Sequence, residues 1–93
     1  MTDRALHVIV HGRVQGVGFR AWTQGEALSR GLAGWVRNRR DGTVEVVIAG
    51  APGAVEAMCD ALRQGPRSAY VSRLDVEDWT GEIPRGFDQR PTV

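Results

Sequence analysis

A run containing three glycines follows the first apolar segment of this 93-residue chain, and it reads Gly12-Arg13-Val14-Gln15-Gly16-Val17-Gly18-Phe19-Arg20. Glycines adopt positive φ angles and let a turn point its backbone amides inward. If a helix begins near Phe19, those amides and the positive end of the helix dipole meet where the guanidinium of Arg20 can bind an anion. The spacing therefore allows a phosphate site. A tight turn with Arg20 solvated explains the same residues and is the more common case for glycines alone.

Two familiar phosphate-binding motifs fit this run poorly. Gly16-Val17-Gly18-Phe19-Arg20-Ala21 matches G-x-G-x-x-A, but a dinucleotide-binding domain requires more parallel strands than this chain supplies. The Walker A loop requires a lysine, and all twelve basic side chains here are arginine. Chemistry that needs a lysine amine, such as a Schiff base, is therefore excluded. Any anion site must use guanidinium groups and backbone amides.

Length and charge bound the class of protein. A chain of 93 residues predicts a single domain over residues 1–93 and excludes a two-domain enzyme. The net charge of +1 is far from that of a general nucleic-acid binder. Residues 1–50 hold seven arginines against four acids and residues 51–93 hold five against seven, so we expect an anionic ligand to bind the first half.

Cysteine usage and the N-terminal segment predict a cytoplasmic protein. The single cysteine, Cys59, can form no internal disulfide, and no Cys/His cluster has the spacing of a structural zinc site. The N-terminal residues contain no continuous apolar stretch typical of a signal peptide or membrane span. We therefore expect a reducing compartment and no membrane partner.

The elements that must position the glycine-rich run follow from apolar periodicity. We expect strands at residues 5–11, 35–38, 43–48 and 70–79, helices at residues 19–30 and 52–64, and a further short strand at 87–90. The order β-α-β-β-α-β is the split βαβ arrangement, in which two right-handed crossovers place both helices on one face of an antiparallel sheet. The fold class is therefore α+β.

Within these elements, the side chains expected to face the core share a strand or helix period. They are Leu6, Val8 and Val10 in the first strand, Phe19, Thr23, Ala27 and Leu28 in the first helix, Val55, Met58, Cys59 and Leu62 in the second helix, and Leu74 and Val76 in the fourth strand.

Several chemically interesting residues have ordinary structural explanations. Asn38 precedes the Asp41-Gly42 hairpin turn, and from the residues alone it is best explained as a turn residue. His7 and His11 share a strand face, but no third ligand is apparent, so sheet-face residues are favoured over a metal pair. Cys59 fits an inert core thiol. The large aromatic side chains favour packing over base stacking; they are Trp22, Trp35, Tyr70 and Trp79.

Three segments together resemble both signature blocks of the acylphosphatase family: Gly12 to Arg20, Gly34-Trp35-Val36-Arg37-Asn38 and Asp41-Gly42-Thr43-Val44-Glu45. The resemblance extends through the second helix and covers nearly the whole chain. It implies a ferredoxin-like α/β sandwich in which Arg20 binds a phosphate and Asn38 positions the attacking water. The resemblance further implies that a loop wraps the phosphate with the backbone amides of Gln15, Gly16, Val17, Gly18 and Phe19.

The activity implied by this resemblance is hydrolysis of the carboxyl-phosphate bond of a small acyl phosphate by direct attack of water. The leaving carboxylate has a conjugate acid with a pKa of about 4, so it needs no general acid at neutral pH. No metal or organic cofactor is expected, and we expect a monomer that binds no nucleic acid. Gly25, inside the first helix, departs from the family pattern and is expected to loosen that helix.

Two alternatives stay open at this point. A non-catalytic phosphate-binding or regulatory module can use the same fold, because fold does not fix function. An RNA-binding domain shares the element order, but residues 44–49 offer none of the stacking aromatics that such a domain uses.

The three arginines around the expected hairpin turn also have two interpretations. Arg37, Arg39 and Arg40 could steer anionic substrates or form a solvated hairpin.

Overall fold

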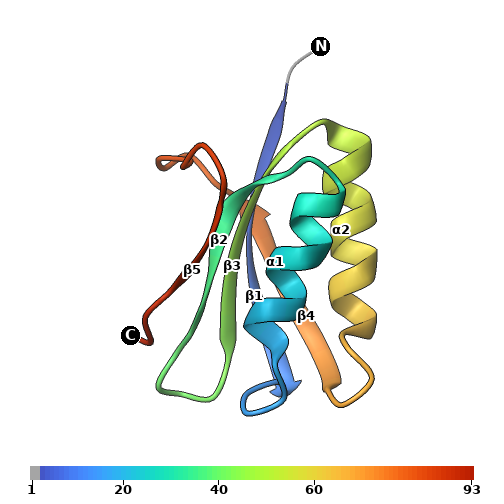
Figure 1. Cartoon of the computed structure of the whole chain (residues 1–93), viewed down its shortest axis with the longest axis vertical. Helices are drawn as coiled ribbons and strands as arrows, with labels where there is room; N and C mark the ends of the chain where they lie inside the picture. Colours follow the sequence, from blue (N-terminus) through green and yellow to red (C-terminus); the bar gives the residue numbers. More distant parts are fainter. Residues whose placement is uncertain (1–2) are drawn as a thin grey trace.

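A five-stranded sheet covered on one face by two helices makes up the molecule, in a computed structural model that describes residues 3–93 (Figure 1). The elements are β1 (Arg4–Arg13), α1 (Phe19–Ser29), β2 (Ala33–Asn38), β3 (Val44–Gly50), α2 (Pro52–Gln64), β4 (Tyr70–Asp78) and β5 (Phe87–Arg90). The strand order is β4-β1-β3-β2-β5. This is the ferredoxin-like arrangement with one added strand, as predicted.

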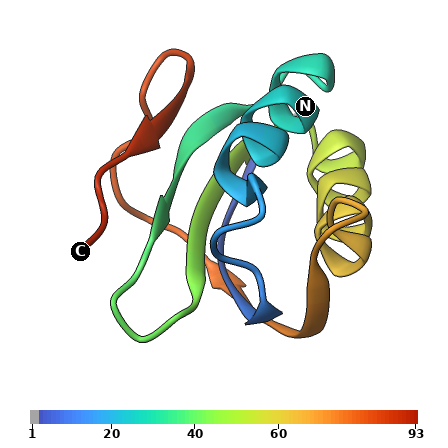
Figure 2. The ribbon, with the colours of Figure 1, turned by 60° about the horizontal axis from the view of Figure 1, so that its bottom comes forward.

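The added strand makes the sheet mixed. β1, β2, β3 and β4 pair antiparallel, but β5 pairs parallel with β2, with Gly34 opposite Phe87. The predicted antiparallel pairing is therefore confirmed for β1, β2, β3 and β4, whereas the short strand β5 pairs in parallel. The parallel direction follows from the connection after β4, which returns the chain to the opposite edge of the sheet (Figure 2).

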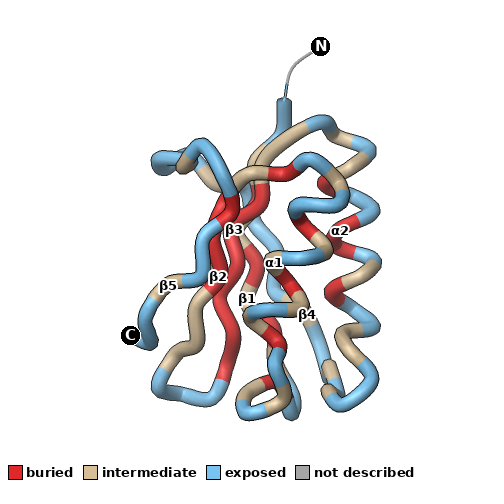
Figure 3. Tube along the Cα trace, in the orientation of Figure 1, coloured by how far each residue is buried: buried red, intermediate tan, exposed pale blue. Residues whose placement is uncertain are grey.

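The core lies between the helices and the sheet (Figure 3). Leu6, Val8 and Val10 of β1 alternate with partly exposed residues and are at most 4% exposed, because successive side chains of a strand point to opposite faces. The central strand β3 is buried on both faces from Val44 to Ile48. Side chains therefore also cover the sheet on the side away from the helices.

Both helices bury most of the side chains expected from the sequence, and two residues predicted to face the core, one in α1 and one in β4, are exposed. Phe19, Thr23 and Ala27 of α1 are buried, as are Val55, Met58, Cys59 and Leu62 of α2. Leu28, predicted to lie beside the α1 stripe, is 56% exposed. Val76 pairs with Val8 on the helical side but is 42% exposed, because β4 is an edge strand.

None of the helices in residues 3–93 is long and apolar enough to cross a membrane.

Candidate functional site

The glycine-rich run forms the loop between β1 and α1, and its backbone needs glycine at two positions. Gly16 and Gly18 have φ angles of 73° and 76°, a region that side-chain-bearing residues rarely adopt. A Cβ atom at either position would meet nothing within 4 Å. The glycines are therefore required by the turn of the chain and not by close packing, and the loop opens toward solvent.

The loop ends at an uncapped helix N-terminus. Gly18 is the N-cap of α1, no side chain accepts a hydrogen bond from the first-turn amides, and the first turn contains no acidic residue. The first backbone bond of the helix runs from Trp22 N to Gly18 O at 3.0 Å. The first-turn amides before it, together with the positive end of the helix dipole, favour an anion.

A pocket of about 210 Å³ lies at this helix end. Its lining comprises Val14, Gly16, Gly18, Phe19, Arg20, Ala21, Asn38 and Gln89. Arg20 from the first turn of α1 and Asn38 from the last position of β2 thus meet in one cavity although they are distant in the sequence. Arg20 makes no ion pair with an acidic side chain within residues 3–93, so its charge is available to an anion.

Gln15 and Val17, which were predicted to contact the phosphate, do not line this pocket. Val17 packs against the core cluster. The side-chain amide of Gln15 instead donates hydrogen bonds to the carbonyl oxygens of Arg39 and Thr43, at 2.7 and 2.8 Å. Gln15 therefore ties the glycine-rich loop to the turn that follows Asn38.

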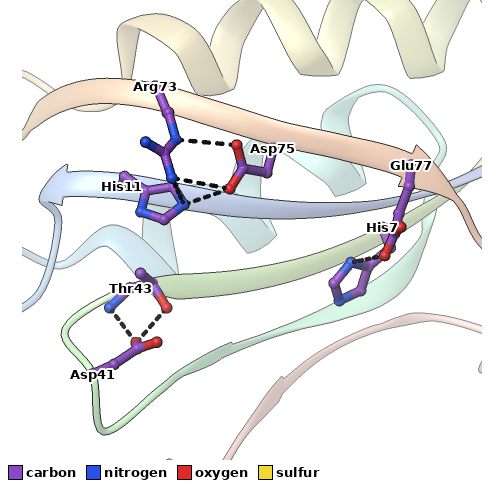
Figure 4. A network of polar contacts seen from close by, with 7 residues as sticks. All are labelled: His7, His11, Asp41, Thr43, Arg73, Asp75 and Glu77. Carbon is purple, nitrogen blue, oxygen red and sulfur yellow. Dashed lines mark hydrogen bonds and ion pairs between the residues drawn. The ribbon is translucent and has the colours of Figure 1, made fainter.

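Hydrogen bonds within the β2–β3 turn itself keep its shape (Figure 4). Asp41 Oδ1 accepts from the hydroxyl of Thr43 at 2.6 Å and from its backbone amide at 3.0 Å. These two hydrogen bonds hold the pKa of Asp41 below its usual range. Gly42, at a φ of 94°, completes the turn as the Asp-Gly signal predicted. The turn thus fixes the chain immediately after Asn38.

The C-terminal segment also contacts the site. Val93 N donates to Asn38 O at 3.2 Å, and Val93 O accepts from Arg40 N at 2.9 Å. Two backbone hydrogen bonds thus connect Val93 to Asn38 and to the turn that follows it. The side-chain amide of Gln89, in β5, donates a hydrogen bond to Gln24 Oε1 at 2.9 Å. No local signal in the sequence indicates Gln89, because the pairing of β5 with β2 alone brings it to the pocket. Val14 and Ala21 were likewise missed, although they directly adjoin the predicted loop and Arg20.

The two histidines lie on the open face of the sheet, and Figure 4 shows His11 beside Asp75 and His7 beside Glu77, whose Oε1 lies 3.5 Å from His7 Nδ1. His7 Nε2 lies 2.7 Å from Glu45 Oε2, and His11 Nε2 lies 2.8 Å from Asp75 Oδ2. No group of three or more potential metal ligands occurs in the part of the chain that the structure describes. Cys59 is 6% exposed, and burial raises the pKa of its thiol, which disfavours a nucleophilic thiolate.

Comparison with known proteins places the chain in a family. The acylphosphatase family profile matches residues 6–89. This chain belongs to the acylphosphatase family. An acylphosphatase of Azorhizobium caulinodans is 61% identical to it over 91 residues, which are 95% of this chain and 96% of that protein.

Solved structures of acylphosphatases share the fold. The protein from Coxiella burnetii superposes with a TM-score of 0.90 at 35% identity, over 95% of this chain and 93% of that chain. The protein from Bacillus subtilis superposes with a TM-score of 0.89 at 38% identity, over 96% of this chain and 99% of that chain. The expected family and fold are therefore confirmed.

Proposed function

We propose that this member of the acylphosphatase family hydrolyses small acyl phosphates to a carboxylate and inorganic phosphate in the pocket at the N-terminus of α1. The convergence of Arg20 and Asn38 on that pocket carries the proposal. Family membership supports the reaction class, and the uncapped helix end supports binding of its phosphoryl group.

Arg20 and the loop amides bind the phosphoryl group in this mechanism. The guanidinium presents a planar fork that makes two parallel hydrogen bonds to phosphoryl oxygens. The backbone amides of Gly16, Gly18 and Phe19, which line the pocket, donate to the remaining oxygens, and the helix dipole adds positive potential. Because these donors are already oriented by the loop, they stabilise the charge that develops in the transition state without rearranging.

Asn38 orients the attacking water. Its side-chain carbonyl accepts a hydrogen bond from the water and its amide can donate, so a lone pair of the water points at phosphorus. The water oxygen forms the new P–O bond while the bond between phosphorus and the acyl oxygen breaks, and the carboxylate leaves with the electron pair. The proton lost by the water passes to a phosphate oxygen or to solvent. The leaving carboxylate needs no proton, so the mechanism uses no general acid and no metal or organic cofactor.

Hydrolysis of benzoyl phosphate, with and without a chelator, tests the reaction. We expect turnover that the chelator does not affect. Arg20→Ala and Asn38→Ala should each lower kcat/KM by about 100-fold or more, the usual loss for one oriented donor in a phosphoryl or acyl transfer site. Arg20→Lys should also be poor, because an ammonium cannot reproduce the planar fork.

Arg67→Ala is the matched control, because Arg67 is exposed and does not line the pocket. Its activity should equal that of the unaltered chain, and thermal unfolding should show that every variant is folded. Phosphate binding without turnover would refute the proposal in favour of a binding module. Near-normal activity in Arg20→Ala or Asn38→Ala would refute the assigned roles.

The proposal extends to the state of the protein: one acylphosphatase-like domain over residues 1–93, monomeric, cytoplasmic and without a nucleic-acid partner. Several features support it. The net charge is +1 and the chain has a single cysteine. Trp35, on the open face of the sheet, is 3% exposed and offers no ring face for base stacking. Sedimentation and a nucleic-acid binding assay test this part directly.

A further inference from the structure

The open face of the sheet carries a second hollow, distinct from the pocket at Arg20. β4 and β5 lie at opposite edges of the sheet, so their connection must cross one of its faces, and the helices occupy the other (Figures 1 and 2). Trp79, at the start of that connection, stacks on His7 with ring centroids 5.6 Å apart and meets Trp35 edge-on at 6.1 Å. The connection therefore forms a wall over β1 and β2.

Two arginines stack on Trp35 beneath this wall. The guanidinium carbon of Arg37 lies 4.7 Å from the indole centroid and that of Arg90 lies 4.8 Å from it. Stacking accounts for the near-complete burial of Trp35 and holds both guanidinium groups in place. The Arg37 side chain of β2 and the Arg90 side chain of β5 are thus held over Trp35 by the protein itself.

The charges of these arginines are incompletely neutralised. Arg37 and Arg90 are in register on the parallel strands β2 and β5, and like charges on adjacent strands repel. Arg37 Nε donates to Glu45 Oε1 at 2.6 Å, its terminal nitrogens form no hydrogen bond with another residue of the described range 3–93, and the side chain lines the hollow. Arg90 makes no ion pair with an acidic side chain within residues 3–93. An anion between the two guanidinium groups would relieve this repulsion.

The rest of the hollow has an apolar wall and one acidic rim residue. Its volume is about 640 Å³, and Trp79, Ile83 and Pro84 line it opposite the arginines. Glu82, which is exposed, also lines it. The carboxylate of Glu82 disfavours a dianionic phosphoryl group more than a monoanion, while the apolar wall favours a ligand with a ring-sized apolar body.

We propose that this hollow binds a monoanionic carboxylate with an apolar body, with the carboxylate on Arg37 and Arg90 and the body against Trp79, Ile83 and Pro84. The site is separate from the phosphate pocket, because Arg37 and Asn38 are successive residues of β2 and point to opposite faces. It neither requires nor alters the hydrolysis proposed above.

The chain's three tryptophans provide the test. Trp35 and Trp79 lie in the hollow, whereas Trp22 packs on Phe19 at the helical side, with centroids 5.3 Å apart. The protein is titrated with benzoate while saturating inorganic phosphate occupies the pocket at Arg20, and the indole N–H signals are followed by NMR. We expect saturable shifts at Trp35 and Trp79 and none at Trp22. Equal shifts at all three signals, no saturation, or the same shifts with sodium chloride at equal ionic strength would overturn the proposal.

Two further probes and three variants sharpen the test. Benzyl alcohol has the ring without the charge and phenyl phosphate adds a second charge, so both should bind more weakly than benzoate. Arg90→Gln should raise the benzoate dissociation constant at least about tenfold, the effect of one charge-assisted bond. Arg67→Gln, its control, should leave the constant unchanged. Glu82→Gln, a change at an exposed residue, should tighten binding about twofold by removing the rim carboxylate. Benzyl alcohol or phenyl phosphate binding as tightly as benzoate, or unchanged constants in both Arg90→Gln and Glu82→Gln, would refute the site.

Discussion

Replacing Gln15 with methionine removes the two hydrogen bonds that tie the phosphate loop to the β2–β3 turn while keeping a side chain of similar length. A net hydrogen bond contributes about 0.5–1.5 kcal/mol to stability. Both accepting carbonyls keep a second donor, since Gly42 N donates to Arg39 O at 3.1 Å and Arg39 N donates to Thr43 O at 2.9 Å. No buried acceptor is therefore left unpaired. We expect a loss of about 1–2 kcal/mol in the free energy of unfolding, which lowers Tm by roughly 4–16 °C in a domain of this size.

The same change should lower kcat more than it changes KM. Arg20 and the amides at the helix end still bind the phosphoryl group in this variant. Gln15 instead holds the glycine-rich loop, which carries these amides, at a fixed distance from Asn38. Misplacing a reacting group by about 1 Å can cost up to about 100-fold in rate, so we expect a loosened loop to lower kcat by roughly tenfold. Gln15 is thus a positioning residue in the proposed mechanism.

Steady-state hydrolysis of benzoyl phosphate and urea unfolding measure the two effects separately. Gln15→Glu is an informative companion, because a carboxylate of the same shape faces two carbonyl oxygens without a donor and should be at least as damaging at neutral pH. A Gln15→Met variant that loses stability but keeps kcat would reduce Gln15 to a structural role. Unchanged stability would refute the estimate from the hydrogen bonds.

Three further changes have definite expected outcomes. Gly25→Ala should raise the free energy of unfolding by about 0.5–1 kcal/mol in urea titrations, because the site is exposed on α1 and an added Cβ meets nothing within 4 Å; lower stability would contradict this. Burial raises the pKa of Glu45, but hydrogen bonds with His7 and Arg37 outweigh it and hold the pKa below its usual range. The Glu45 carboxylate therefore stabilises the fold at pH values above its pKa in the unfolded chain, about 4.3, and this contribution is lost as the pH falls through its lower pKa in the folded protein. The free energy of unfolding should thus fall less steeply with decreasing pH in Glu45→Gln; the same dependence on pH in both proteins would contradict this. Gln89→Leu should raise KM by about threefold and leave kcat unchanged, since Gln89 lines the phosphate pocket but lies outside the Arg20 and Asn38 pair; an unchanged KM with a reduced kcat would show instead that Gln89 acts on the chemical step.

Features encoded by local periodicity could be predicted from the sequence. The alternation in β1 and the i, i+3, i+4, i+7 stripe of α2 fix which side chains are buried without reference to the rest of the chain. Arg20 and Asn38 could be named as candidate site residues because the chain resembles the signature blocks of the acylphosphatase family, although the residues alone favour a turn role for Asn38. Their meeting in one pocket follows once the β-α-β-β-α-β order is known.

Features set by long-range pairing could not be predicted in this way. The parallel pairing of β5 with β2 depends on the path of the chain across the open face, and no local pattern specifies that path. The pairing brings Gln89 to one pocket and Arg90 to the other hollow. The exposure of Val76 has the same kind of cause, since its inward orientation is local but the edge position of β4 is not.

The use of arginine alone among basic residues has a physical consequence on both faces of the sheet. In the pocket, the planar fork of Arg20 matches two phosphoryl oxygens, which a lysine ammonium would meet as a point charge. On the open face, the guanidinium groups of Arg37 and Arg90 lie over the indole of Trp35, and a compact, strongly hydrated ammonium would cover less of the ring. Composition indicated only that an anion site in this chain uses guanidinium groups, and it gave no sign of the stacking on Trp35, which requires two strands to be in register. A lysine at position 90 would therefore keep the charge of the hollow while exposing Trp35 to solvent.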